Sequence, residues 1–439
     1  MQLTNKPISI GAALAAATCA LLGAPVANAG ESDELWQFDT ALMYYGETDR
    51  VTAVEAIIAA TKDFGDEQIF SGKVTIDGLT GASATGAVAQ PTAQTFTRPS
   101  GEGNYVTPAG ETPLDDTFHD TRLQLTANWT QPIADNMRAT GGFNFSNEYD
   151  YLSFAVNGSL AYDLNQKNTT LSLGLSYAFD TIKPEGGIPL ALSSVVINPN
   201  GDDGNEQENE NNSEFADDFN LSRVGDSDNK DTIDVMVGVT QVINRRMLMQ
   251  FNYGLSMVDG YTTDPFKYLS VVNEQGLTQD LRYENRPTQR TRNSFYWQTK
   301  YAMDFGVADI SYRFATDDWK IDSHTIDSRL RINLTDSTYI QPHLRYYQQA
   351  AAEFYRPFLL EDAALPEFVS ADYRLGEMTA YTVGLKYGMT LDNGNELAFR
   401  LEYYQQTPKN AGFSEPGVLQ DVDLYPSLKA VIAQVSYRF

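Results

Sequence analysis

The residues that could perform acid–base chemistry are few. The sequence contains three histidines, His119, His324 and His343, which lie far apart along the chain. His324 follows Ser323 and lies close to Asp327, so a Ser-His-acid hydrolase of the outer-membrane phospholipase kind is one hypothesis. Adjacent residues of a strand point to opposite faces, however, so Ser323 and His324 cannot form a dyad with each other. We therefore expect no enzymatic activity and keep the hydrolase as an alternative.

Carboxylates and cysteines give no strong signal for a metal site. Asp317-Asp318 and the acidic run from Asp202 to Glu210 offer oxygen ligands for calcium, but neither has the glycine-punctuated loop of familiar calcium sites. The single cysteine, Cys19, lies in an apolar segment near the amino terminus, so the rest of the chain can form no disulfide. We expect no metal and no cofactor.

A second group of chemically active residues is charged and alternates with apolar residues. If the apolar positions face lipid, ten of these side chains fall on the opposite, inward face. These lumen candidates are Arg122, Arg292, Asp309, Arg313, Asp327, Arg329, Arg331, His343, Arg345 and Arg400. A ladder of opposed charges can orient and select a hydrated solute. Alternatively, the same residues only fill and brace a narrow interior.

Segments with a two-residue period must position these side chains. In the clearest one, Leu171, Leu173 and Leu175 alternate with small polar residues, which predicts a strand with one apolar face. The segment 51–61 also fits a short helix. Sixteen strands are predicted, at 36–45, 51–61, 68–77, 122–129, 137–147, 151–162, 171–180, 231–242, 247–258, 290–302, 307–316, 322–334, 339–349, 378–390, 396–406 and 429–439.

Short and long connections alternate between these strands. The long ones are 78–117, 181–230, 259–289, 350–377 and 407–427. A closed antiparallel sheet with an even strand number pairs every backbone group and leaves no edge. The sequence therefore predicts an all-β transmembrane β-barrel of about sixteen strands, with short periplasmic turns and long extracellular loops.

Three stretches qualify this prediction. Pro342 cannot donate a ladder hydrogen bond, so we expect a bulge there or a strand that starts later. The pliable segment 78–117 is a candidate plug of the lumen. The acidic stretch 201–218, GDDGNEQENENNSEFADD, has too few apolar residues to pack a core and should be mobile.

The two ends of the chain carry targeting signals. Lys6, an apolar run from Ile8 to Leu22 and Ala27-Asn28-Ala29 predict a signal peptide at 1–29 that is cleaved before Gly30. The last strand ends in Tyr437 and Phe439. This ending looks like the signal by which the barrel-assembly machinery recognises outer-membrane proteins.

Composition excludes some classes of function. The net charge of −27 argues against binding nucleic acid through a basic face. After the signal segment no apolar run reaches about twenty residues, the length that a membrane helix needs. The 25 tyrosines and 22 phenylalanines fit aromatic girdles at two membrane interfaces.

Several motifs, distributed over nearly all of the mature chain, resemble an uncharacterised family of Gram-negative outer-membrane barrels, a domain of unknown function. They are IDGLTGASATGA (76–87), FHDTR (118–122), EYDY (148–151), DGYTTDPFKYLSVV (259–272), YENRPTQRTRNS (283–294), TDDWKIDSHT (316–325), QPHLRYY (341–347) and FYRPFL (354–359). The resemblance implies a barrel without an agreed activity. It also implies a periplasmic lipoprotein or thioredoxin-like partner, because members are often encoded beside such proteins.

Two functional classes follow from these features. The first is a channel or transporter for small hydrophilic solutes in the bacterial outer membrane, in contact with lipid and lipopolysaccharide. The alternative is a non-conducting barrel that acts as a scaffold for a periplasmic redox or lipoprotein partner.

Overall fold

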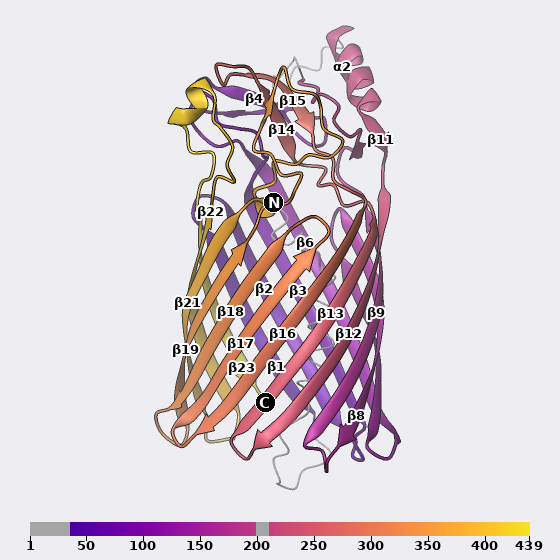
Figure 1. The fold of residues 1–439 in the computed structure, drawn as a ribbon, viewed down its shortest axis with the longest axis vertical. Coiled ribbons are helices and arrows are strands. Elements are labelled where there is room, and N and C mark those ends of the chain that lie inside the picture. The colour runs from indigo at the N-terminus through magenta and orange to yellow at the C-terminus, as the bar shows by residue number, and fades with distance from the viewer. Residues whose placement is uncertain (1–35, 199–209) are drawn as a thin grey trace.

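The fold is a closed barrel of sixteen antiparallel strands, seen in a computed structural model that describes residues 36–198 and 210–439 (Figure 1). Neighbours in sequence are neighbours in the barrel, and the last strand pairs with the first. The strands are β1 (Gln37–Glu47), β2 (Val51–Asp63), β3 (Ile69–Ala84), β6 (Leu114–Ala134), β7 (Met137–Asn147), β8 (Tyr151–Leu164), β9 (Thr169–Ile182), β12 (Asp228–Asn244), β13 (Met247–Gly260), β16 (Gln289–Met303), β17 (Gly306–Asp317), β18 (Asp322–Asn333), β19 (Thr338–Gln349), β21 (Met378–Thr390), β22 (Glu396–Pro408) and β23 (Leu428–Arg438). The predicted sixteen-strand barrel is confirmed, and segment 51–61 is a strand. The predicted signal peptide at 1–29 lies outside the described residues.

The barrel closes where β1 meets β23. Asp39 pairs with Arg438 in the ladder, and their side chains form an ion pair of 2.6 Å. The backbones of Phe38 and Phe439 exchange two hydrogen bonds of 2.8 and 2.9 Å, and their rings stack with centroids 5.3 Å apart. The ring therefore has no unpaired edge at the junction between the two chain ends.

The two faces of the wall differ in polarity. On β9, Leu171, Leu173 and Leu175 are exposed on the outside, whereas Ser176 and Asp180 are buried on the inside. An apolar exterior over a polar interior is the pattern of a barrel that lies in lipid. No helix of the described residues is long and apolar enough to cross a membrane.

The two ends of the barrel differ in the length of their connections. Short turns, such as 135–136 and 165–168, join strands at the end that also holds the start of β1 and the end of β23, here called the turn end. The opposite, loop end carries all five long connections. β6 is the longest strand, with 21 residues, and its ladder with the 16-residue β3 continues to the pair Ala84↔Leu114 at the loop end.

The long connections fold together into a cap over the loop end (Figure 1). The cap consists of residues 85–113, 183–198 with 210–227, 261–288, 350–377 and 409–427. Its elements are β4 (Gln94–Thr97), β5 (Asn104–Thr107), β10 (Ile188–Pro189), α2 (Glu210–Leu221), β11 (Arg223–Gly225), β14 (Tyr268–Val272), β15 (Thr278–Tyr283), β20 (Leu359–Leu360), η1 (Tyr373–Leu375) and η2 (Gly417–Asp421).

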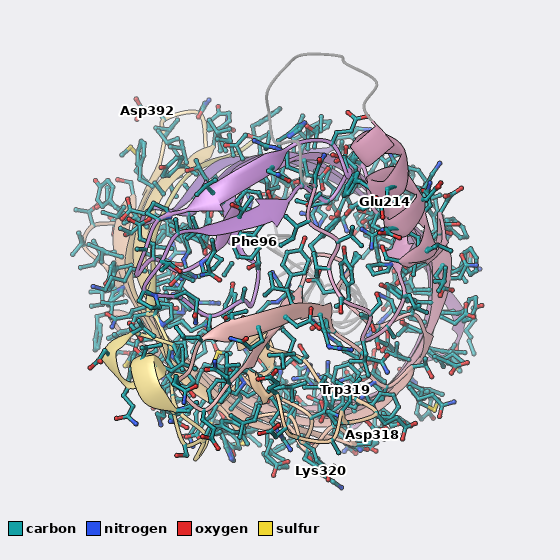
Figure 2. All side chains as sticks on the ribbon, turned by 90° about the horizontal axis from the view of Figure 1, so that it is seen from above. Phe96, Glu214, Asp318, Trp319, Lys320 and Asp392 are labelled. Carbon is teal, nitrogen blue, oxygen red and sulfur yellow. The ribbon has the colours of Figure 1, made fainter. Side chains whose placement is uncertain are left out.

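Residues 261–288 are the centre of the cap, because each of the other four connections bonds to them. The backbone bonds are Tyr268 to Thr85 (2.7 Å), Val195 to Leu281 (2.7 Å), Asn285 to Val369 (2.9 Å) and Val418 to Gln275 (2.9 Å). Phe96 stacks on Tyr105 and Tyr268 in a buried cluster, and it lies over the interior of the ring in the view from the loop end (Figure 2). The core of large apolar side chains therefore lies in the cap.

Three local expectations need correction. The predicted plug, 78–117, is barrel strand at both of its ends, 78–84 and 114–117, and 85–113 belongs to the cap. Residues 201–209 of the acidic stretch 201–218 lie outside the described residues, and residues 210–218 belong to α2, whose Phe219 ring lies 4.2 Å from the Arg223 guanidinium. Pro342 causes no bulge. The β18–β19 ladder has the same register at Arg329↔His343 and at Ile332↔Ile340, and only the two residue pairs between them are missing.

Candidate functional site

All ten lumen candidates occupy inner-face positions of the wall. The ladders align them with other inner-face residues, for example Ser311 with Asp327 and Asp327 with Arg345. Exposed apolar residues such as Leu344 and Ile326 occupy the alternate, outer positions. The structure separates the ten residues into several groups, so they form no single continuous ladder.

The first group centres on His343, which is buried between two carboxylates. Its Nε2 lies 3.0 Å from Asp327 Oδ2, and its Nδ1 lies 2.9 Å from Glu402 Oε1. Ionised carboxylates accept hydrogen bonds and cannot donate them, so this geometry suits an imidazolium that donates from both nitrogens. Arg329 lies 3.5 Å from Asp327, and Arg400 lies 3.8 Å from Glu402. Five side chains from β18, β19 and β22 thus form one charged network.

Two further groups lie elsewhere on the inner face. Arg122 donates to Asp77 at 2.8 Å through Nε and lies 3.6 Å from Glu55. Asp309 accepts from Gln298 at 2.8 Å and has Lys300 at 3.9 Å. The pairing of Arg122 with Asp77 and Glu55 was not predicted from the sequence, although the alternation of β3 places Asp77 on the inner face.

The remaining four arginines have no carboxylate partner within the described part of the chain. Arg313 lies over the ring of Tyr296 at 5.3 Å, and Arg331 lies over that of Tyr339 at 3.7 Å. Arg292 and Arg345 form no hydrogen bond or ion pair with the residues that the structure describes. The positive charges of these four guanidinium groups are therefore not balanced by a carboxylate of the described chain.

The structure does not bring together Ser323, His324 and Asp327, the residues that suggested a hydrolase. His324 faces outward, where its Nδ1 lies 2.7 Å from the Tyr312 hydroxyl and its ring lies 5.1 Å from Phe314. Ser323 points inward and is buried, and Asp327 is bonded to His343. The residues that suggested a hydrolase thus lie on opposite faces of the wall.

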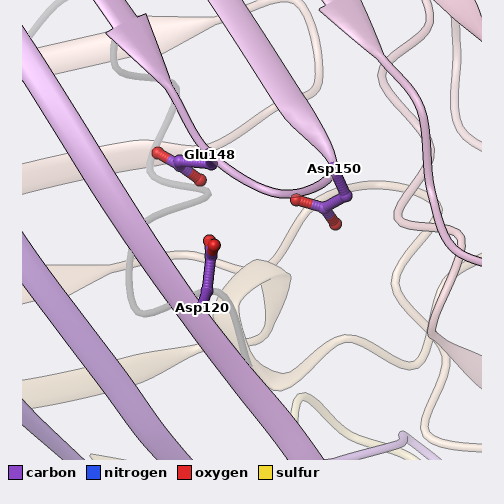
Figure 3. A group of neighbouring side chains, drawn as sticks. All are labelled: Asp120, Glu148 and Asp150. Atoms are coloured by element: carbon purple, nitrogen blue, oxygen red, sulfur yellow. The ribbon is translucent and has the colours of Figure 1, made fainter.

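Acidic side chains gather at one place on the rim of the loop end. Asp120 of β6 and the turn residues Glu148 and Asp150 bring carboxylate oxygens within 4.8 Å of one another (Figure 3). Burial raises the pKa of Glu148 to about 8, and the negative charge of the nearby Asp120 is the second-largest cause of this shift. Oxygen ligands of this kind suit a divalent cation such as calcium. By contrast, Asp317 and Asp318 are already bonded, to Arg290 and to the Thr291 amide.

A buried ion network holds the cap together. Arg286 lies 2.6 Å from Glu284 and 2.8 Å from Asp372, and Arg374 bonds Asp372 and Asp264. Burial alone would raise the pKa of Asp372, but Arg374 and Arg286 outweigh it and hold that pKa well below its usual range. Burial also lowers the pKa of Lys267, whose ammonium donates to Ser83 and to the Ala84 carbonyl. The network connects residues 261–288, 350–377 and the end of β3.

A family model described as "Protein of unknown function (DUF3570)" matches residues 11–439. The chain belongs to this family. A search of curated proteins finds no match. The family membership confirms the coarse resemblance drawn from the motifs, and it assigns no activity.

Solved barrels resemble this member of the family at low identity. A bacterial polysaccharide outer membrane secretin is 9% identical, with 93% of this chain and 100% of that chain covered and a TM-score of 0.41. OmpT of Vibrio cholerae is 10% identical, with 94% and 99% covered and a TM-score of 0.40. CdiB from Acinetobacter baumannii is 6% identical, with 92% and 60% covered and a TM-score of 0.43. Function must therefore be inferred from this chain's own residues.

Proposed function

We propose that this DUF3570 protein is an integral protein of the Gram-negative outer membrane that conducts small hydrophilic solutes. In this orientation the turn end faces the periplasm and the cap faces the cell exterior. The observation that carries the proposal is the pairing of a sixteen-strand wall with a charged inner face. Barrels of sixteen to eighteen strands leave an aqueous interior, whereas eight-stranded barrels are filled by side chains.

The arrangement of inner-face charges supports selection as well as passage. The His343 network and the Arg122 group place opposed charges on different parts of the wall. Arg292, Arg313 and Arg345 add guanidinium groups without carboxylate partners. A transverse field between such groups orients a dipolar solute and favours its hydrated passage.

The cap supports a second candidate, a barrel that does not conduct. Its buried cluster around Phe96 lies over the ring and leaves less room for a solute to enter from that end. In that case the protein would serve as a scaffold for a periplasmic lipoprotein or thioredoxin-like partner at the turn end.

Planar-bilayer recording of the refolded protein separates these candidates. We compare the full chain with a variant in which a short turn replaces residues 85–113, which leaves β3 and β6 intact. Conductance that rises in the variant supports a capped channel. If neither protein conducts while both show heat-modifiable gel migration, the channel is rejected. Recovery of a specific periplasmic partner from envelopes then supports the scaffold.

The double variant Arg313→Gln/Arg345→Gln tests selection. We expect its reversal potential to shift towards cation preference relative to the full chain, because two inward guanidinium groups are lost. Lys167→Gln is the matched control, since Lys167 lies in a turn at the turn end, where it pairs with Glu67. An equal shift in this control would contradict selection by the inner face.

A further inference from the structure

A hollow in the inner wall includes Arg292 and lies apart from the His343 network and the Arg122 group. Its volume is about 30 Å³, and inner-face residues of β8, β9, β12, β13 and β16 line it. Its polar side chains include Asn157, Ser176, Asp234, Ser256, Arg292 and Ser294. Gly174 and Gly254 also line the hollow, and they leave space in it because they have no side chains. The space holds about two waters, and a larger ligand would project from it into the lumen.

Asp234 is the unusual residue of this hollow. Asp234 is only 9% exposed, and neither carboxylate oxygen accepts a hydrogen bond of ordinary geometry from the described chain. The buried hydroxyl of Ser256 is the neighbouring group that stabilises the carboxylate, and no cation of the described chain pairs with it. A buried carboxylate without a cation is costly, so a ligand that supplies a cationic group would bind favourably.

Arg292 supplies the opposite charge to the same hollow. The ladders align Asp234 with Ser256 and Ser256 with Arg292, so the acid and the base stand on one row, two strands apart. With strands about 4.8 Å apart, their α-carbons are separated by about 10 Å. Within the described residues the two side chains form no ion pair with each other. The space between them therefore suits a molecule with a cation at one end and an anion at the other.

We propose that this hollow binds a free α-amino acid as a zwitterion. The ammonium group donates to Asp234 and the Ser256 hydroxyl, and the carboxylate accepts from Arg292. The amino acid's side chain then points into the lumen. A simple cation would approach Arg292 unfavourably, and a simple anion would approach Asp234 unfavourably, so the pair of charges selects zwitterions. This inference rests on the proposed function and names the class of solute.

Equilibrium dialysis of the full chain, refolded in detergent micelles, tests the site without any measurement of current. The probes are L-alanine, ethylamine, which lacks the carboxylate, and propionate, which lacks the amine. We expect saturable binding of alanine and at least about tenfold weaker binding of each probe with one charge. Failure of alanine to bind, or equal binding of ethylamine or propionate, overturns the proposal.

Variants then locate the site. Asp234→Asn and Arg292→Gln should each weaken alanine binding at least about tenfold. Asp304→Asn should leave it unchanged, because Asp304 lies in an exposed turn at the turn end, where it pairs with Arg246. An equal loss in Asp304→Asn overturns the assignment. If a hollow variant fails to fold, the probe comparison on the unaltered chain still decides. If alanine binds but the protein does not conduct, the channel is rejected and the amino-acid site is retained. If the protein conducts but alanine does not bind, the site is rejected and the channel is retained.

Discussion

Removal of one carboxylate from the ion network of the cap should loosen the cap while leaving the barrel closed. Asp372 is buried and bonded to both Arg286 and Arg374, so Asp372→Asn leaves two buried guanidinium groups with one negative charge fewer. Removing one partner of a buried ion pair costs about 3–5 kcal/mol. We therefore expect cap opening to become about 10²- to 10⁴-fold more frequent, at 1.4 kcal/mol for each factor of ten.

Hydrogen exchange in detergent micelles measures this opening. The amides of Val369 and Asn285 are suitable reporters, because they bond to each other's carbonyls between two cap segments. Exchange there should accelerate in Asp372→Asn, while the amide of Leu173 in β9 should stay protected. Heat-modifiable gel migration confirms that the barrel is intact in each variant.

The matched control is Asp280→Asn in the same cap. Asp280 pairs with Arg282 at 3.0 Å, but both side chains are about 30% exposed. Such a pair contributes about 0–1 kcal/mol, so its loss should change exchange by less than about tenfold. If both substitutions accelerate exchange equally, or if Asp372→Asn has no effect, the network does not hold the cap.

The other predictions concern single residues. Burial raises the pKa of Glu148 to about 8 in the folded chain, so folding favours its protonated form. The stability of the turn at 148–150 should therefore fall as pH rises from about 4.5 to about 8, and Glu148→Gln should flatten a hydrogen-exchange profile over this range. Pro342→Val should restore the missing β18–β19 bond and stabilise the barrel against urea by about 1 kcal/mol, whereas an unchanged midpoint would contradict this. Phe439→Ala removes ring contacts with Phe38 and Tyr437. It should lower the amount assembled in cells, and undiminished assembly would argue against an assembly signal.

The barrel could be predicted because its evidence is local in the sequence. A two-residue period is visible within a single strand such as 171–180, and it assigns each side chain to a face. The end of β3 was harder to predict. Gly78 and Gly81 suggested a loop, but the strand continues to Ala84. At Gly81, φ is +140° and an added Cβ would lie 2.4 Å from the Arg50 carbonyl, so the backbone requires glycine there.

The groupings on the inner face could not be predicted in the same way. Whether His343 meets Asp327 and Glu402 depends on the register of three ladders, which periodicity does not determine. The hollow around Asp234 depends on five strands and on two glycines that leave space. The cap could not be predicted from the sequence, because its contacts join loops that are far apart in the chain. The contact between Phe96 and Tyr268 is an example.

The length of the β3–β6 ladder has a mechanical consequence. These two strands run from the turn end to the root of the 85–113 segment, and they carry Asp77 and Arg122 on the way. A stiff hairpin transmits force along its length, so tension applied to the outer surface by a large molecule should reach this ion pair directly. Contact at the outer surface and charge on the inner face would then be coupled through these two strands.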